Sequence, residues 1–276
     1  MSISAQEVNK LRKATGAGMM DCKKALVETE GDFEKAIDLL RLKGQKVSAK
    51  RADRETTEGA VFVQTNGDAT NGFLVALGCE TDFVAKNDEF VGLGNSLLEI
   101  LSTKSVADVA ALKAETLASG EKVDDYITNL VGKIGEKIDI VDVSVVEGDT
   151  VVPYIHSNNK LGVLVSLNKK GGPVADAGKD VAMQIAAMNP VALKKEDVAA
   201  DVVERELALG REQAISEGKP EAIVDKIAQG KLGKFYKDNT LLEQPFVKDG
   251  SKSVSQMLND VESGLTVSLF KRISIG

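Results

Sequence analysis

The sequence contains few of the residues that build metal centres and nucleophilic active sites. Its 276 residues include two cysteines, Cys22 and Cys79, and one histidine, His156. The cysteines have no metal-ligand spacing, so a zinc site would have to consist mainly of carboxylates. A cysteine-dependent enzyme would need a Cys–His pair, and nothing in the sequence brings these residues together. We therefore expect no metal and no cofactor, and we interpret both cysteines as buried apolar residues in a reducing compartment.

The sequence also lacks long apolar segments and the motifs of common enzyme active sites. No apolar run approaches the roughly 20 residues of a transmembrane helix, and residues 1–13 contain no apolar block typical of a signal peptide. We therefore expect a cytoplasmic protein that does not bind membranes. Gly67 and Gly72 have the glycine spacing of a phosphate-binding loop, but Phe73 stands where that loop has lysine. No Gly-x-Ser-x-Gly sequence is present, so a binding protein is favoured over an enzyme.

The chain is acidic overall, with one local concentration of cations. Its formal net charge is −7, which argues against direct binding of nucleic acid by the whole molecule. Lys43, Lys46, Lys50 and Arg54 follow at helical spacing and share one predicted face. Such a face is usually part of a solvated connecting helix, which is the interpretation we favour. The alternative is a ribosome- or RNA-binding adaptor that acts through residues 43–54.

Residues 1–44 have the pattern of three short helices. Ser4 begins a capping-box sequence ahead of the first helix, and apolar residues recur at helical spacing after it. A loop with two glycines precedes the second helix and ends in Met19 and Met20. One explanation is that a methionine packs into the core. The other is that both are exposed as a surface for a partner, and the sequence favours neither.

A pattern of strand, turn, strand and helix occurs twice. Residues 60–65 and 72–79 predict the first pair of strands, and residues 152–156 and 162–167 predict the second. The second strands of the two pairs are closely similar in sequence. We therefore infer two related subdomains in an α+β core with antiparallel sheets.

The segment Cys79–Asn87 joins strand to helix in the first copy. One interpretation is that Thr81 or Asp82 caps the helix and Phe83 packs into the core, which residue type alone favours. The other is that Asp82 and Phe83 point outward at the edge of the sheet. The second copy has Gly171–Pro173 at this place, and that difference indicates that function resides in the first copy.

The remaining helices predict an inserted antiparallel hairpin. Residues 196–217 and 221–236 are charged and helical, and Gly-Lys-Pro joins them. The hairpin is expected to project for contact with a partner or for formation of a homodimer. The predicted division is a helical domain with linker at 1–54, a first core subdomain at 55–141, a second core subdomain at 142–190 together with 231–276, and the hairpin at 191–230.

Two long motifs resemble the signatures of one protein family. Residues Leu11–Leu26 (LRKATGAGMMDCKKAL) and Cys79–Asn87 (CETDFVAKN) resemble the two signatures of bacterial elongation factor Ts, in the same order. The resemblance continues through residues 155–156, 223–234 and 244–247. It implies a ubiquitin-associated-like three-helix domain, a two-subdomain α+β core and a helical hairpin. In many members a further helix follows the last strand and contacts the GTPase. The present sequence ends at Gly276, directly after the last predicted strand.

The resemblance also implies a function. Members bind the translational GTPase elongation factor Tu and promote release of GDP as guanine-nucleotide exchange factors, without covalent chemistry. The motif at residues 81–84 is implied to enter beside the nucleotide pocket, where it displaces helices and dislodges Mg²⁺. Two methionines would contact the GTPase domain, and the histidine would contact a second domain of the partner. The implied contact residues are Thr81, Asp82, Phe83, Val84, Met19, Met20 and His156.

Overall fold

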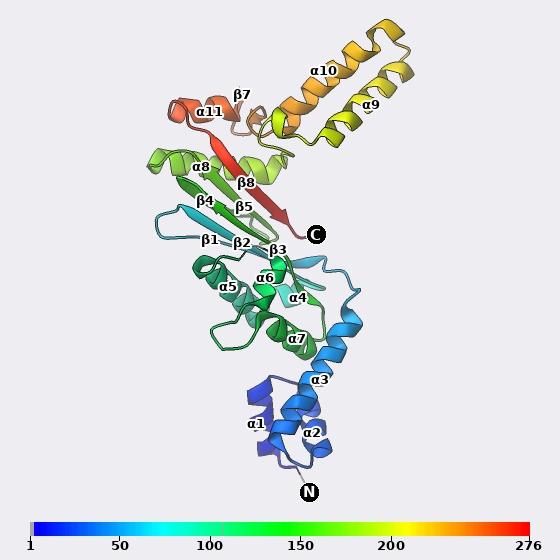
Figure 1. Ribbon diagram of the computed structural model, residues 1–276, viewed down its shortest axis with the longest axis vertical. Helices are drawn as coiled ribbons and strands as arrows, with labels where there is room; N and C mark the ends of the chain where they lie inside the picture. The colour runs from blue at the N-terminus through cyan, green and yellow to red at the C-terminus, as the bar shows by residue number, and fades with distance from the viewer. Residues whose placement is uncertain (1–2, 107) are drawn as a thin grey trace.

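The computed structural model describes residues 3–106 and 108–276 and has an elongated shape (Figure 1). A helical unit lies at the N-terminal end, a mixed helix-and-sheet body lies in the middle, and a helical hairpin projects from the other end. The α+β architecture with antiparallel sheets that the sequence predicts is confirmed. None of the helices in the described ranges combines the length and the apolar character needed to cross a membrane.

The N-terminal helices are α1 (Ala5–Thr15), α2 (Met19–Glu28) and α3 (Phe33–Arg51). Ser4 and Glu7 form the predicted capping box at the start of α1. Gly16 ends α1 with a φ of 66°, a left-handed conformation that glycine adopts without a steric penalty. The small core between the helices contains Val8, Leu11, Cys22, Ala25, Leu26 and Ala36.

Helix α3 continues well beyond this small core. It runs without interruption to Arg51, after which residues 52–54 form a turn and a bend. The prediction that Arg54 shares a helical face with Lys43 is therefore wrong. Helix α3 therefore extends from the helical unit toward the body, and residues 52–57 connect it to β1 without helix or strand.

The first sheet has the strand order β1-β2-β3 and contains β1 (Glu58–Thr65), β2 (Asn71–Cys79) and β3 (Ile138–Glu147). Phe73, Val75 and Leu77 alternate along β2 and face the helices that follow it. These helices are α4 (Asp82–Ala85), α5 (Asp88–Thr103), α6 (Val109–Ala114) and α7 (Val123–Ile134). Together they bury one face of the sheet.

The second sheet has the strand order β4-β5-β8 and contains β4 (Thr150–Ile155), β5 (Leu161–Leu167) and β8 (Val267–Ser274). Helix α8 (Gly172–Met188) packs against it, and α11 (Val254–Val261) packs against α8. A short hairpin of β6 (Pro245–Phe246) and β7 (Asp249–Ser253) precedes α11. The last strand, β8, pairs with β5 and so returns to this sheet.

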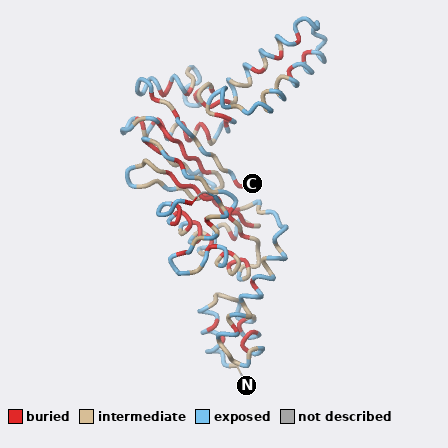
Figure 2. Tube along the Cα trace, viewed as in Figure 1, coloured by how far each residue is buried: buried red, intermediate tan, exposed pale blue. Residues whose placement is uncertain are grey.

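The uncovered faces of the two sheets pack against each other. Leu74 from β2 and Leu164 from β5 occupy equivalent positions in the repeated sequence and lie in one buried cluster between the sheets. Figure 2 shows the resulting buried segments in the middle of the molecule. Gly72 permits the close approach, because a Cβ atom there would lie 2.6 Å from Cγ1 of Val151 in the other sheet.

The projecting hairpin consists of α9 (Ala200–Ser216) and α10 (Glu221–Asn239), preceded by the short helix η1 (Lys195–Asp197). Gly210 of α9 lies against Ala228 of α10, so two small residues bring the helices together. Helix α10 continues past residue 230, and β3 spans the predicted boundary at 141. The division of the chain into four segments stays a prediction.

Candidate partner-binding site

The segment Thr81–Val84 forms a short exposed turn at the end of β2. Thr81 has extended backbone angles and is the N-cap of α4, and its hydroxyl accepts a hydrogen bond from the N–H of Val84. Val84 is 6% exposed and belongs to the core of the first sheet, whereas Phe83 is 82% exposed. The interpretation that Phe83 packs into the core is therefore wrong, although the capping role of Thr81 is confirmed.

Glu136, which lies between α7 and β3, holds this turn in place. Its carboxylate accepts hydrogen bonds from the backbone N–H of Thr81 at 3.1 Å and from the Thr81 hydroxyl at 3.0 Å. The neighbouring residues make the reciprocal contact, because the N–H of Lys137 donates to Glu80 at 2.6 Å. The start of the turn is thus fixed by two pairs of adjacent residues.

Glu80 also joins the turn to the end of α3. The guanidinium of Arg51 donates to both oxygens of its carboxylate, at 2.7 and 2.9 Å. Burial by itself raises the pKa of Glu80, but hydrogen bonds from Lys137 and Arg51 outweigh burial and hold this pKa below its ordinary value. The Lys137 ammonium in turn donates to the carbonyl oxygens of Ala52 and Arg54. No sequence pattern predicts this junction, since its members come from three distant segments.

The charged residue of the turn points into solvent. Asp82 forms an ion pair with Lys86 at 2.7 Å, one helical turn further on. The hydrogen bond from Lys86 lowers the pKa of Asp82, so this side chain is a carboxylate at neutral pH. The side chain of Thr81 caps α4, so the Asp82 carboxylate is not used as the cap. It is exposed and can contact another molecule.

Cys79 is buried beneath the turn. Its thiol donates to the carbonyl oxygen of Thr81 at 3.1 Å. Burial, followed by the negative charge of Glu136, raises the pKa of Cys79 to about 12. The residue is thus a neutral thiol that supports the turn, and it lacks the low pKa of a nucleophilic cysteine.

The predicted methionine contacts lie in the N-terminal helical unit. Met19 and Met20 are 53% and 63% exposed at the first residues of α2, so neither packs into the core. The Gly18 backbone caps this helix. Of the two interpretations of this loop, exposure of both methionines is confirmed.

His156 lies on a third element. It follows the last residue of β4 and is exposed, and its Nδ1 is 3.0 Å from the hydroxyl of Tyr154. The turn, the methionines and the histidine lie on three separate elements, at α4, at the start of α2 and after β4 (Figure 1). Such a distribution suits contact with a large partner. Within the described ranges, no group of three or more His, Cys, Asp or Glu side chains is arranged to hold a metal ion.

Internal pairing occupies two cations of the basic segment 43–54, one on the predicted face and one beside it. Lys43 forms an ion pair with Asp21, and Arg51 forms one with Glu80. A cation that is paired within the protein contributes less to a phosphate-binding surface. This observation does not favour the RNA-adaptor alternative.

The sequence has close relatives over its full length. The profile of a family described as elongation factor TS matches residues 80–276. An elongation factor Ts of Cytophaga hutchinsonii is 57% identical over 275 residues, which cover 99% of each chain. The elongation factor Ts of Amoebophilus asiaticus is 53% identical, and that of Thermobifida fusca is 45% identical, each over at least 98% of both chains. Since both the family profile and full-length relatives match, the chain belongs to the elongation factor Ts family.

Proposed function

We propose that the protein is a guanine-nucleotide exchange factor of translation elongation, which binds the GTPase elongation factor Tu and promotes release of GDP. The observation that carries this proposal is the exposure of Phe83 on a turn whose next residue, Val84, is buried. An aromatic ring that is held outward on a fixed support suits insertion into another protein. Membership of the elongation factor Ts family supports the choice of partner.

The proposed mechanism requires no covalent step. An exchange factor binds the nucleotide-free form of the GTPase more tightly than the GDP-bound form, so by linkage the GTPase holds GDP less tightly. Thr81 and Val84 hold the turn, while Asp82 and Phe83 enter beside the nucleotide pocket and displace nearby helices. A bound Mg²⁺ is often the largest local charge at a phosphate site, where it neutralises the phosphates. Dislocation of this ion in the GTPase therefore weakens the binding of GDP.

Phe83 by itself supplies only part of the required free energy. Burial of one such side chain stabilises a complex by about 1.5–3 kcal/mol. Each tenfold change in affinity requires about 1.4 kcal/mol, so one ring accounts for about one or two powers of ten. The remaining contacts are assigned to Met19 and Met20 on the GTPase domain and to His156 on a second domain.

The experiment is stopped-flow release of fluorescently labelled GDP from elongation factor Tu. The protein is expected to accelerate release, and Phe83→Ala is expected to reduce that acceleration at least tenfold. Val261→Ala is the matched control, because Val261 is an exposed apolar residue of α11 outside the proposed contact set. Release that is unaffected by the wild-type protein would refute the proposed function.

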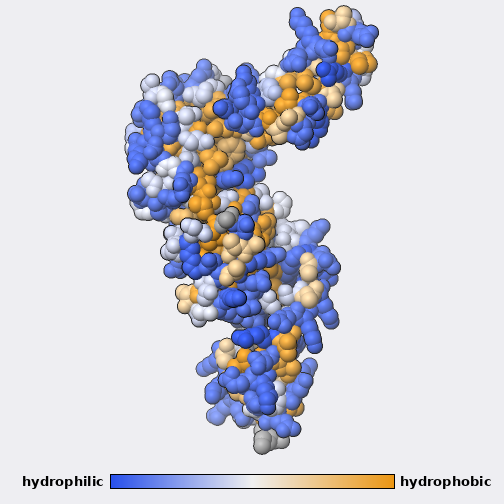
Figure 3. Space-filling model, viewed as in Figure 1, coloured by the Kyte–Doolittle hydropathy of each residue, from blue (hydrophilic) through white to orange (hydrophobic). Residues whose placement is uncertain are grey.

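We propose further that the hairpin of α9 and α10 mediates self-association. Leu209, Ile215 and Ile223 are exposed apolar side chains on this hairpin, and Figure 3 shows apolar surface along it. Sedimentation equilibrium should give a dimer that Leu209→Ser and Ile215→Ser weaken. A monomer at every tested concentration would refute this proposal.

A further inference from the structure

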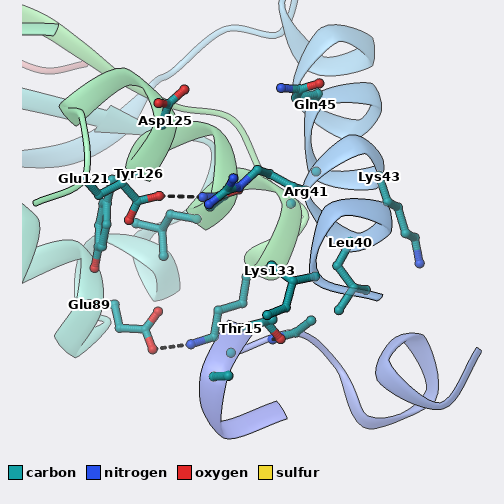
Figure 4. A pocket seen from close by; sticks show the side chains of 18 of the residues that line it. Thr15, Leu40, Arg41, Lys43, Gln45, Glu89, Glu121, Asp125, Tyr126 and Lys133 are labelled. Atoms are coloured by element: carbon teal, nitrogen blue, oxygen red, sulfur yellow. Dashed lines mark hydrogen bonds and ion pairs between the residues drawn. The ribbon is translucent and has the colours of Figure 1, made fainter. Parts of the chain in front are cut away.

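The N-terminal helical unit packs against the body mainly through α3. This helix has 19 residues and is therefore about 28 Å long. Its first turns belong to the helical core, where Ala36 is fully buried, and its later turns pack against α7. An open groove of about 1050 Å³ lies beside this contact, between the helical unit and α7 (Figure 4).

The Lys133 side chain of α7 also contacts the helical unit across the groove. This side chain lies against Gly16 at the end of α1. It also forms an ion pair with Glu89, which Figure 4 shows.

The body also holds the end of α3, through the ion pair of Arg51 with Glu80. The Lys137 ammonium adds hydrogen bonds to the carbonyl oxygens of Ala52 and Arg54. With this end of α3 fixed, the position of the helical unit relative to the body depends on how α3 crosses α7.

Two glycines meet at this crossing, and they are not equivalent. A Cβ atom added at Gly132 of α7 would lie 2.5 Å from the Cα of Gly44, so the two helices would have to move apart by about 1 Å. A Cβ atom added at Gly44 would meet its nearest neighbours, the carbonyl oxygen of Thr128 and the Cα of Gly132, at 3.6 and 3.7 Å. These are ordinary contact distances. Only Gly132 is thus required for the observed spacing.

The end of α7 that carries Gly132 is fixed to the exposed turn. It ends at Ile134, and the residues that follow include Glu136 and Lys137, which bond to Thr81 and Glu80. The support of Phe83 and the crossing with α3 are therefore parts of one rigid connection. At the far end of α3, α2 presents Met19 and Met20.

We propose that Gly132 is a positioning residue that sets where the Met19–Met20 surface lies relative to Phe83. This inference rests on the proposed function, in which both surfaces bind one elongation factor Tu molecule. When two contact surfaces lie on one rigid body at the separation of their two sites on the partner, no further conformational entropy is lost in bringing them into position. A displaced α3 moves the methionines away from that match while the turn stays in place.

The test compares Gly132→Ala with Gly44→Ala in the full-length protein. Both replace a glycine within a helix by alanine and gain similar helix propensity, but only the first forces the helices apart. For Gly132→Ala, the concentration of exchange factor that gives half-maximal GDP release should rise about fivefold, as expected for partial loss of one buried methionine contact. The rate at saturation should change less than about twofold. Gly44→Ala should behave as the wild-type protein.

A second readout shows whether the effect passes through the methionines. In a Met19→Ala, Met20→Ala background, Gly132→Ala should cause no further loss, because the surface that it misplaces is already absent. In a Phe83→Ala background its effect should persist. Spin labels at Lys24→Cys in α2 and Asp142→Cys in β3 measure the distance between the helical unit and the body. That distance should change for Gly132→Ala and should stay at the wild-type value for Gly44→Ala. Both positions are exposed.

Each outcome has a defined meaning. Equal half-maximal concentrations for the two alanine variants, or an undiminished effect of Gly132→Ala without the methionines, would overturn the positioning role. Should Gly132→Ala fail to fold, Arg51→Ala tests the same connection by releasing the end of α3 from Glu80. A wild-type protein that does not accelerate GDP release would refute the proposed function instead, and the label separation would still test the crossing.

Discussion

The Glu136 carboxylate accepts hydrogen bonds from both the backbone N–H and the hydroxyl of Thr81, although 55 residues separate the two in the chain. Thr81 in turn caps the short helix that carries Phe83. The conformation of the turn is therefore set by a side chain from outside it. This relationship makes Glu136 the first residue to test.

Glu136→Ala should lower the free energy of unfolding by about 1–2 kcal/mol, because two donors of Thr81 lose a charged acceptor in a half-buried site. Urea unfolding measures the change. Glu136→Gln keeps one acceptor oxygen and should retain more of the stability. If the alanine variant unfolds at the wild-type urea concentration, the contact does not stabilise the turn.

Phe83→Ala and Val84→Ala should separate binding from folding. Phe83 is exposed, so its loss should change the free energy of unfolding by less than about 0.5 kcal/mol. Val84 is buried in the core cluster, so its truncation should cost about 2 kcal/mol. Thermal or urea unfolding of the two variants makes the comparison. A strongly destabilised Phe83→Ala would show that the ring has a structural role.

Asp82→Ala should slow GDP release and leave the fold unchanged. The N-cap of α4 is Thr81, and the side-chain partner of Asp82 among the described residues is the exposed Lys86. Exchange kinetics and the melting temperature should both be measured. A lower melting temperature with unaltered exchange would indicate that Asp82 stabilises the helix and does not contact the partner.

Stability at acidic pH should depend on Glu80. Its folded-state pKa is lower than its ordinary value of 4.5, so its contribution is complete above that value and is lost as the pH falls through the folded-state pKa. Between about pH 5 and pH 3, Glu80→Gln should therefore lose less stability than the wild-type protein. Urea midpoints across this range provide the measurement, and parallel pH profiles would disprove the linkage.

Cys79 should resist alkylation in the folded protein. With a pKa of about 12 in place of the ordinary 9.0, its thiolate fraction at a given pH is about a thousandfold lower. A Cys22→Ser variant isolates the reaction of Cys79 with iodoacetamide. Labelling should require denaturant, and rapid labelling of the native variant would contradict the assigned pKa.

Local patterns in the sequence were sufficient for most of the secondary structure. The capping box at Ser4, the glycine that ends α1 and the two pairs of strands depend on residues close in the chain. The similarity of the two hairpins also predicted the α+β core. The prediction of a helical face that extends to Arg54 was wrong. Helix α3 ends at Arg51, where Arg51 and Lys137 make contacts with residues distant in the chain.

The sequence by itself determined that a capped turn follows β2 and that an aromatic and a carboxylate lie in it. Only the tertiary structure decided that Val84 enters the core and Phe83 faces solvent. Adjacent residues on a helix point in different directions, so the placement of the sheet selects which one is buried. Likewise the supports of this turn, Glu136 and Arg51, come from segments that only folding brings together.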